Sequence, residues 1–116
     1  MYKLYFERDG IVQPTWYQIC FESVALSKAN IPPSEWDTVV GLVRKLKKAG
    51  KADGSTVMDV PLYKLDTEGS QKVELETAEF NMLLKFIEGT QWKVAVLETV
   101  VDVRDWLEHL PPADAK

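Results

Sequence analysis

Nucleophilic and acid–base chemistry in this chain of 116 residues would have to be built on very few side chains. His109 is the single histidine and Cys20 the single cysteine. A Ser–His–Asp or Cys–His mechanism needs a histidine that a third group holds in position, and His109 lies near the end of the last expected helix. Cys20 falls on an apolar helical face, where a lone cysteine usually serves packing. The sequence therefore predicts no catalytic residues, and we expect the protein not to be an enzyme.

A second candidate for chemistry is the acidic series Glu98, Asp102, Asp105 and His109, whose spacing places it on one helical face. Metal sites in helical bundles draw carboxylate and histidine ligands from several facing helices and point into the core. This face instead lies about 200° from the apolar stripe of its own helix. We interpret it as a solvated acidic face and predict neither a metal nor an organic cofactor. An enzyme that uses this face with a divalent metal is the last-ranked alternative.

The segment 50–56 combines glycines, a lysine and hydroxyl groups, as phosphate-binding loops do. A P-loop follows a strand, opens a helix and ends in Gly-Lys-Ser/Thr. This segment follows an expected helix and leads into an expected strand, so the sequence excludes a P-loop.

Charge is unevenly distributed along the chain. Residues 1–51 carry a net +3 and residues 52–116 a net −7, which together give the −4 of the whole chain. The basic excess is concentrated in five residues: Arg44, Lys45, Lys47, Lys48 and Lys51. Such a split can bring copies together head to tail or guide an acidic partner. The alternative is that these cations complement the dipole at the end of a helix.

The same basic residues make nucleic acid the alternative partner. Nucleic-acid-binding domains usually combine a strongly basic surface with a recognisable motif. The chain is acidic overall and contains neither a helix-turn-helix sequence nor an aromatic-basic RNA motif. A protein partner or self-association is therefore the leading expectation.

Four tryptophans are many for a chain of this size, and Trp106 is the one that falls beside the apolar stripe of its helix. It either covers the rim of the core or anchors a protein partner, because tryptophan is enriched at interface hot spots. Trp106 and the five basic residues are the candidate partner-binding residues.

The pattern of apolar residues, prolines and glycines predicts seven elements. Strands are expected at 2–8, 58–63 and 72–75, and helices at 16–30, 34–49, 76–89 and 96–110. Residues 92–97 are open between a short strand and the start of the last helix, because β-branched residues weaken helix propensity. The fold class is α+β, in the order β-α-α-β-β-α-α, with four helices packed on a three-stranded, mainly antiparallel sheet. Residues 1–110 form a single domain, and residues 111–116 form a flexible tail.

Several details of these elements can be tested. Ser34 is expected to cap the second helix, and Glu76 or Thr77 the third, with Glu79 in its first turn. Pro61 places its strand at a sheet edge, and residues 51–55 are expected to be a loop. The second helix should bury Trp36, Val39, Val40, Val43 and Leu46, and the last helix Val96, Val100, Val103, Leu107 and Leu110.

The location follows from what the chain lacks. One cysteine allows no internal disulfide, which favours a reducing compartment. No segment approaches the ~18 apolar residues of a membrane span, and the N-terminal residues alternate apolar with charged side chains. We expect a cytoplasmic protein with no membrane partner.

One stretch of the chain resembles small proteins encoded in tailed bacteriophages and prophages. It consists of residues 73–80 (VELETAEF), Leu83-Leu84, Gly89-Thr90 and Trp92, after a helix start at residues 31–34 (IPPS). The resemblance implies an accessory or assembly protein and assigns no functional residues. The leading hypothesis is thus a non-enzymatic interaction protein, and a nucleic-acid-associated regulator is the alternative.

Overall fold

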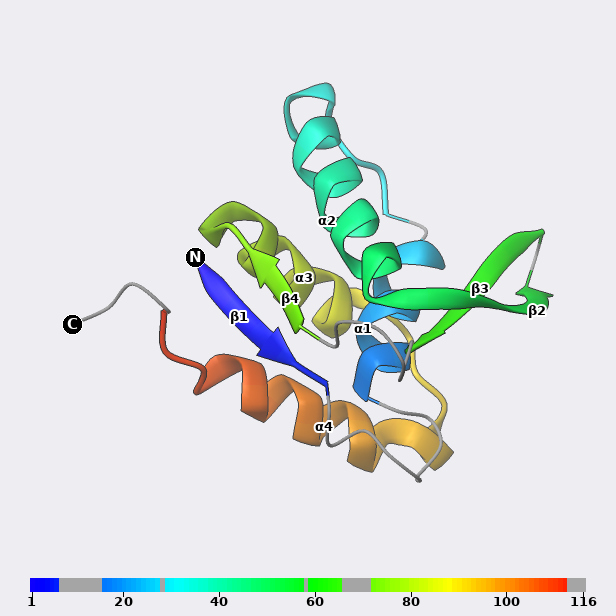
Figure 1. The fold of residues 1–116 in the computed structure, drawn as a ribbon. Helices are drawn as coiled ribbons and strands as arrows, with labels where there is room; N and C mark the ends of the chain where they lie inside the picture. Colours follow the sequence, from blue (N-terminus) through cyan, green and yellow to red (C-terminus); the bar gives the residue numbers. More distant parts are fainter. Residues whose placement is uncertain (7–15, 28, 58, 66–71, 113–116) are drawn as a thin grey trace.

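The computed structural model describes residues 1–6, 16–27, 29–57, 59–65 and 72–112. The elements follow in the order β1 (Tyr2–Tyr5), α1 (Trp16–Ala25), a 3-10 turn η1 (Pro33–Glu35), α2 (Trp36–Lys48), β2 (Gly50–Val57), β3 (Val60–Leu65), β4 (Lys72–Leu75), α3 (Thr77–Gly89) and α4 (Val94–Glu108). Four helices combine with antiparallel strand pairs, which confirms the α+β class (Figure 1).

The strands form two separate two-stranded pairs rather than the expected single sheet of three. The segment predicted as a loop is strand β2, which pairs with β3 through a tight turn in which Asp59 adopts a φ of 66°. Strand β4 pairs antiparallel with β1, where Leu75 lies opposite Tyr2, and not with β3. The polar residues of β2 form a strand because β3 satisfies their backbone groups, a pairing that side-chain alternation does not reveal.

The prediction for β3 is correct in one respect. Pro61 lies opposite Thr56 in a pair that has only two strands, so its strand is an edge strand. The β2–β3 hairpin projects away from the helices (Figure 1).

The end of α1 and the start of α2 differ from the predictions. α1 ends at Ala25 instead of residue 30, because the Ser27 amide donates to Val24 O in a tighter turn. Ser34 lies within the 3-10 turn and makes no capping bond, so the prediction that it caps the second helix is wrong. Glu76, one of the two residues expected to cap α3, is its N-cap, and its amide donates to the carboxylate of Glu79 in a capping box.

The prediction for the buried face of α2 is partly wrong. Leu42 and Leu46 are its fully buried residues, whereas Trp36 is 56% exposed and Val40 44% exposed. Valine and leucine occur all round this helix, so the spacing alone does not identify the side that faces the core.

The buried stripe of the last helix is predicted correctly, although α4 runs Val94–Glu108 and not over residues 96–110. It buries Val100, Val103 and Leu107, with Val96 and Leu110 packed beside them. Its helical turns begin at Val94, which decides the question left open for residues 94–97 in favour of a helix.

Helix α1 lies at the centre of the molecule and contacts α2, α3, α4 and β3. Its side chains Tyr17, Ile19, Cys20 and Phe21 are all buried in the core, as predicted for Cys20. Helices α2 and α4 each pack against both α1 and α3, and they lie on opposite sides of α3 in Figure 1. Each therefore keeps an outer face of its own.

Candidate interaction surfaces

An apolar face of α4 is exposed. Val94 is 84% exposed, Leu97 40% and Val101 39%. Spacings of three and four residues place these side chains together on one side of the helix, and that side is turned away from the buried stripe of Val100 and Val103. The prediction from the sequence names a single apolar stripe on this helix and misses the second one, although the same spacing rule reveals it.

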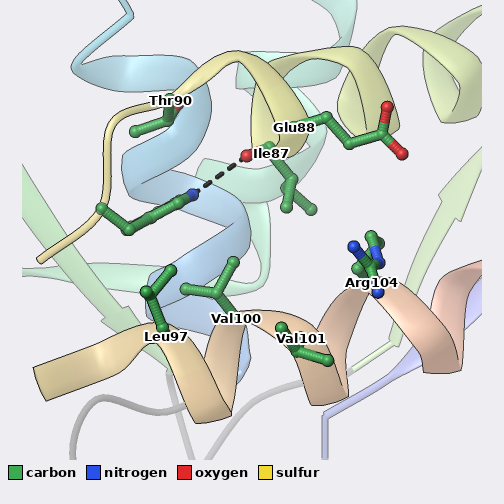
Figure 2. Close-up of a pocket in the computed structure, with 8 residues that line it drawn as sticks. Ile87, Glu88, Thr90, Leu97, Val100, Val101 and Arg104 are labelled. Atoms are coloured by element: carbon green, nitrogen blue, oxygen red, sulfur yellow. Dashed lines mark hydrogen bonds between the residues drawn. The ribbon is translucent and has the colours of Figure 1, made fainter. Parts of the chain in front are cut away.

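A groove adjoins this face, between α4 and the end of α3. Its volume is about 260 Å³. Its walls are formed by Ile87, Glu88, Thr90, Trp92, Leu97, Val100, Val101 and Arg104. Figure 2 shows that Leu97 and Val100 extend from α4 toward the end of α3.

The α3 wall of this groove is fixed by hydrogen bonds to the last turn of the helix. The Trp92 indole N–H donates to Ile87 O at 2.9 Å, the bond drawn in Figure 2. The Thr90 hydroxyl donates to Phe86 O at 2.7 Å. The wall is therefore largely formed before any partner arrives, which lowers the entropic cost of binding.

Arg104 supplies the positive charge of the groove. Its Nε is buried and finds no hydrogen-bond acceptor among the residues that the structure describes, while one terminal nitrogen lies 3.2 Å from Oδ1 of Asp105. Glu88 stands on the opposite wall (Figure 2). The groove thus combines apolar walls with a charge of each sign.

A second exposed apolar face lies on α2 and begins at Trp36. The Trp36 indole N–H donates to Ile31 O at 2.9 Å, which holds the ring in place. Val40 follows one turn later, then the exposed side chains of Arg44 and Lys47. This face is apolar at the start of the helix and basic at its end.

The five basic candidates do not act as one group in the structure. Lys45 is half-buried and bonds to the carboxylate of Glu79, so it serves the packing of α2 on α3. Lys47 lies over the ring of Tyr63, with 5.5 Å from its nitrogen to the ring centroid. The other three, Arg44, Lys48 and Lys51, are exposed.

One further lysine joins the basic surface. Lys64 of β3 lies directly opposite Lys51 of β2, and like charges that face each other across a strand pair repel. Sequence reasoning did not group them because the β2–β3 pairing was not predicted.

Trp106 lies at the rim of the core. Its ring is half-buried. The centroid of that ring lies 5.0 Å from the ring centroid of Trp16 and 5.7 Å from that of Phe6. These contacts agree with the first of the two roles considered for it, that of covering the core.

The acidic series on α4 is exposed at Glu98, Asp102, Asp105 and His109. Nδ1 of His109 lies 2.7 Å from Asp105 O, a carbonyl of its own helix. No group of three or more potential metal ligands occurs within the described part of the chain.

Two pKa shifts fall outside these surfaces. Burial raises the pKa of the Tyr17 phenol, whose hydroxyl donates to Leu46 O at 2.6 Å. The hydrogen bond from Lys72 lowers the pKa of the Glu74 carboxyl on β4. Neither group lines the groove.

Among the described residues, no helix has the length and apolar character that crossing a membrane requires. Comparison with protein-family models, with curated proteins and with solved structures finds no match.

Proposed function

We propose that this chain is a non-enzymatic protein–protein interaction or assembly protein. The observation that carries the proposal is the exposed apolar face of α4, formed by Val94, Leu97 and Val101. The largest contiguous apolar patch on the surface of a small domain is often an interaction site. The adjoining groove adds a tryptophan and an arginine, residue types that are enriched among interface hot spots.

The positions of the reactive side chains support the non-enzymatic part of the proposal. The Cys20 thiol is fully buried among core residues. The His109 ring lies on the outer face of α4, against a backbone carbonyl of the same helix. Neither side chain faces the groove, so a reaction in the groove would have neither of them as nucleophile or base.

The resemblance to phage and prophage proteins suggests the setting of this role. Within the proposal, the chain takes part in virion or tail assembly, or acts on a host protein, in the cytoplasm of an infected cell. Rigid faces on a small domain suit such work because little conformational entropy is lost on binding.

The proposal is tested by replacing Val94, Leu97 and Val101 together with serine. The unaltered chain should either self-associate in light scattering or retain a protein from a bacterial lysate, and the triple variant should lose that behaviour. Val57→Ser is the matched control, because Val57 is an exposed valine on the β2–β3 hairpin. Circular dichroism verifies that all chains are folded.

A different result would contradict the proposal. The unaltered chain has no interaction surface on α4 if it stays monomeric and if the triple variant retains every lysate protein that the unaltered chain retains.

A nucleic-acid-associated regulator is the second candidate, favoured by the like-charged pair Lys51 and Lys64. A phosphate backbone would relieve their repulsion, and its binding would weaken steeply with salt. Fluorescence anisotropy with labelled DNA and RNA tests this candidate, with Lys48, Lys51 and Lys64 replaced by glutamate. No binding at low salt would end it.

A further inference from the structure

The exposed faces of α2 and α4 follow the same spacing with opposite charge. On α2 the series is Trp36, Val40, Arg44 and Lys47, and on α4 it is Leu97, Val101, Asp105 and Glu108. Each series runs at intervals of four, four and three residues. Each is apolar in its first two members and charged in its last two, basic on α2 and acidic on α4.

Helix geometry places each series on one face. At about 100° per residue, the four positions fall within an arc of about 80°, and at 1.5 Å per residue each series extends about 16 Å along its axis. All eight side chains are exposed. The two faces therefore match in length, in position along the helix and in chemical order.

The order of the residues fixes the direction of a contact between them. With the two helices parallel, Trp36 and Val40 lie beside Leu97 and Val101. The cations of α2 then lie beside the anions of α4. An antiparallel contact would place apolar residues against charged ones at each end of the interface. The charged groups would then leave water without gaining a partner, which is costly.

The contacts that these charges already make do not oppose the arrangement. Asp105 pairs with its neighbour Arg104 at the surface, and Lys47 lies over Tyr63. Exposed ion pairs and exposed cation–π contacts stabilise a fold only weakly, so they can be exchanged for contacts that exclude water.

We propose that α2 of one copy of this chain packs in parallel on α4 of a second copy, which deepens the proposed function and rests on it. The two faces belong to different sides of one molecule, since α2 and α4 each pack on α1 and α3 (Figure 1). One copy thus offers its α2 face to one neighbour and its α4 face to another. Such a head-to-tail contact repeats into a ring or a filament.

The groove beside Leu97 and Val101 gives this contact a specific anchor. Trp36 is the largest exposed apolar side chain on α2, and in the parallel arrangement it lies at the end of α4 where the groove opens. A tryptophan in an apolar pocket is a common interface anchor.

Charge reversal on each face tests the contact. One variant carries Arg44→Glu and Lys47→Glu, and the other carries Asp105→Lys and Glu108→Lys. We expect light scattering to show assembly of the unaltered chain that weakens as salt rises. Each variant alone should return to the 13.2 kDa mass of a single chain. An equimolar mixture of the two should assemble again, because each reversed face then meets an opposite charge.

Matched controls reverse the same number of charges away from the two series. Lys48→Glu with Lys51→Glu controls for the basic face, and Glu98→Lys with Asp102→Lys for the acidic one. Both controls should assemble as the unaltered chain does. Equal loss of assembly in the controls, or failure of the mixture to assemble, overturns the proposed contact.

The remaining outcomes separate this inference from the function on which it rests. A chain that stays monomeric but retains a lysate protein through Val94, Leu97 and Val101 overturns the contact between copies and leaves the interaction function standing. A monomeric chain that instead binds DNA through Arg44 and Lys47 overturns the contact in favour of nucleic acid. A monomer that binds neither contradicts both proposals.

Discussion

The Tyr17 hydroxyl donates a hydrogen bond to the Leu46 carbonyl oxygen at 2.6 Å, and this bond joins the central helix α1 to the last turn of α2. Both residues are fully buried. The bond therefore helps to set the position of α2, whose outer face carries Trp36 and Val40. Interaction surfaces on this protein depend on core contacts of this kind.

Replacing Tyr17 with phenylalanine should destabilise the fold by about 1 kcal/mol. The variant loses one buried hydrogen bond, but Leu46 O keeps the bond that it accepts from the Ala49 amide, so the cost stays near the lower end of the usual range. Urea unfolding followed by circular dichroism measures the change. A variant as stable as the unaltered chain would show that this bond does not support α2.

Alkaline pH should also destabilise the protein through Tyr17. Burial raises the pKa of this phenol above its ordinary value of 10.0. Below that value, both the folded and the unfolded chain keep the proton. Above it, the unfolded chain loses the proton while the folded chain retains it, so the free energy of unfolding falls by about 1.4 kcal/mol per pH unit. Urea titrations at rising pH measure this decline, and Tyr17→Phe should make it shallower. Equal slopes in both chains would contradict this assignment.

Gly50 should not tolerate a side chain. A Cβ at this position would lie 2.7 Å from the Lys64 carbonyl oxygen and would collide with the Tyr17 hydroxyl. Crowding of this kind in a packed interior costs about 1–3 kcal/mol. Gly89→Ala is the control, because a Cβ there meets no atom within 4 Å. Thermal unfolding should show a clear loss for Gly50→Ala and little change for Gly89→Ala.

Lys45 should contribute to stability and not to partner binding. The buried carboxylate of Glu79 bonds to Lys45 and to the Glu76 amide, at 2.9 Å in the second case. Lys45→Met leaves that carboxylate without its cation, at a cost of about 1–2 kcal/mol because the pair is partly exposed. The exposed neighbour Lys48→Met should change stability by less than about 0.5 kcal/mol. Equal stability of the two variants in urea would refute the structural role.

Trp106→Ala should lower stability by about 2–3 kcal/mol without weakening assembly. The half-buried ring packs on Trp16 and Phe6, and removing it opens a cavity at the rim of the core. Trp106→Phe should restore part of the stability. A stable Trp106→Ala variant that no longer assembles would instead identify this residue as the partner anchor.

Sequence reasoning succeeded where a local pattern decides the structure. The capping box of α3 is built from Glu76 and Glu79, three residues apart. The buried stripe of α4 repeats at spacings that only one face of a helix provides. Both patterns are formed by residues close together in sequence, which is why the sequence predicts these two helices.

Sequence reasoning failed where the structure depends on pairing between distant strands or on which side of a helix faces the core. Strand β4 pairs with β1, so Leu75 lies opposite Tyr2 although the two residues are far apart in sequence. No turn signal marks such a pairing. The second apolar face of α4 was visible in the spacing of Leu97 and Val101. Only the packing of α4 on α1 and α3 shows which of its two stripes is buried and which is exposed.

The most direct test of the account is the light-scattering mass of the unaltered chain at rising concentration. Contact between α2 and α4 of successive copies predicts a mass above 13.2 kDa that grows with concentration and falls as salt is added. A mass that stays at 13.2 kDa at every concentration and at low salt would contradict that contact.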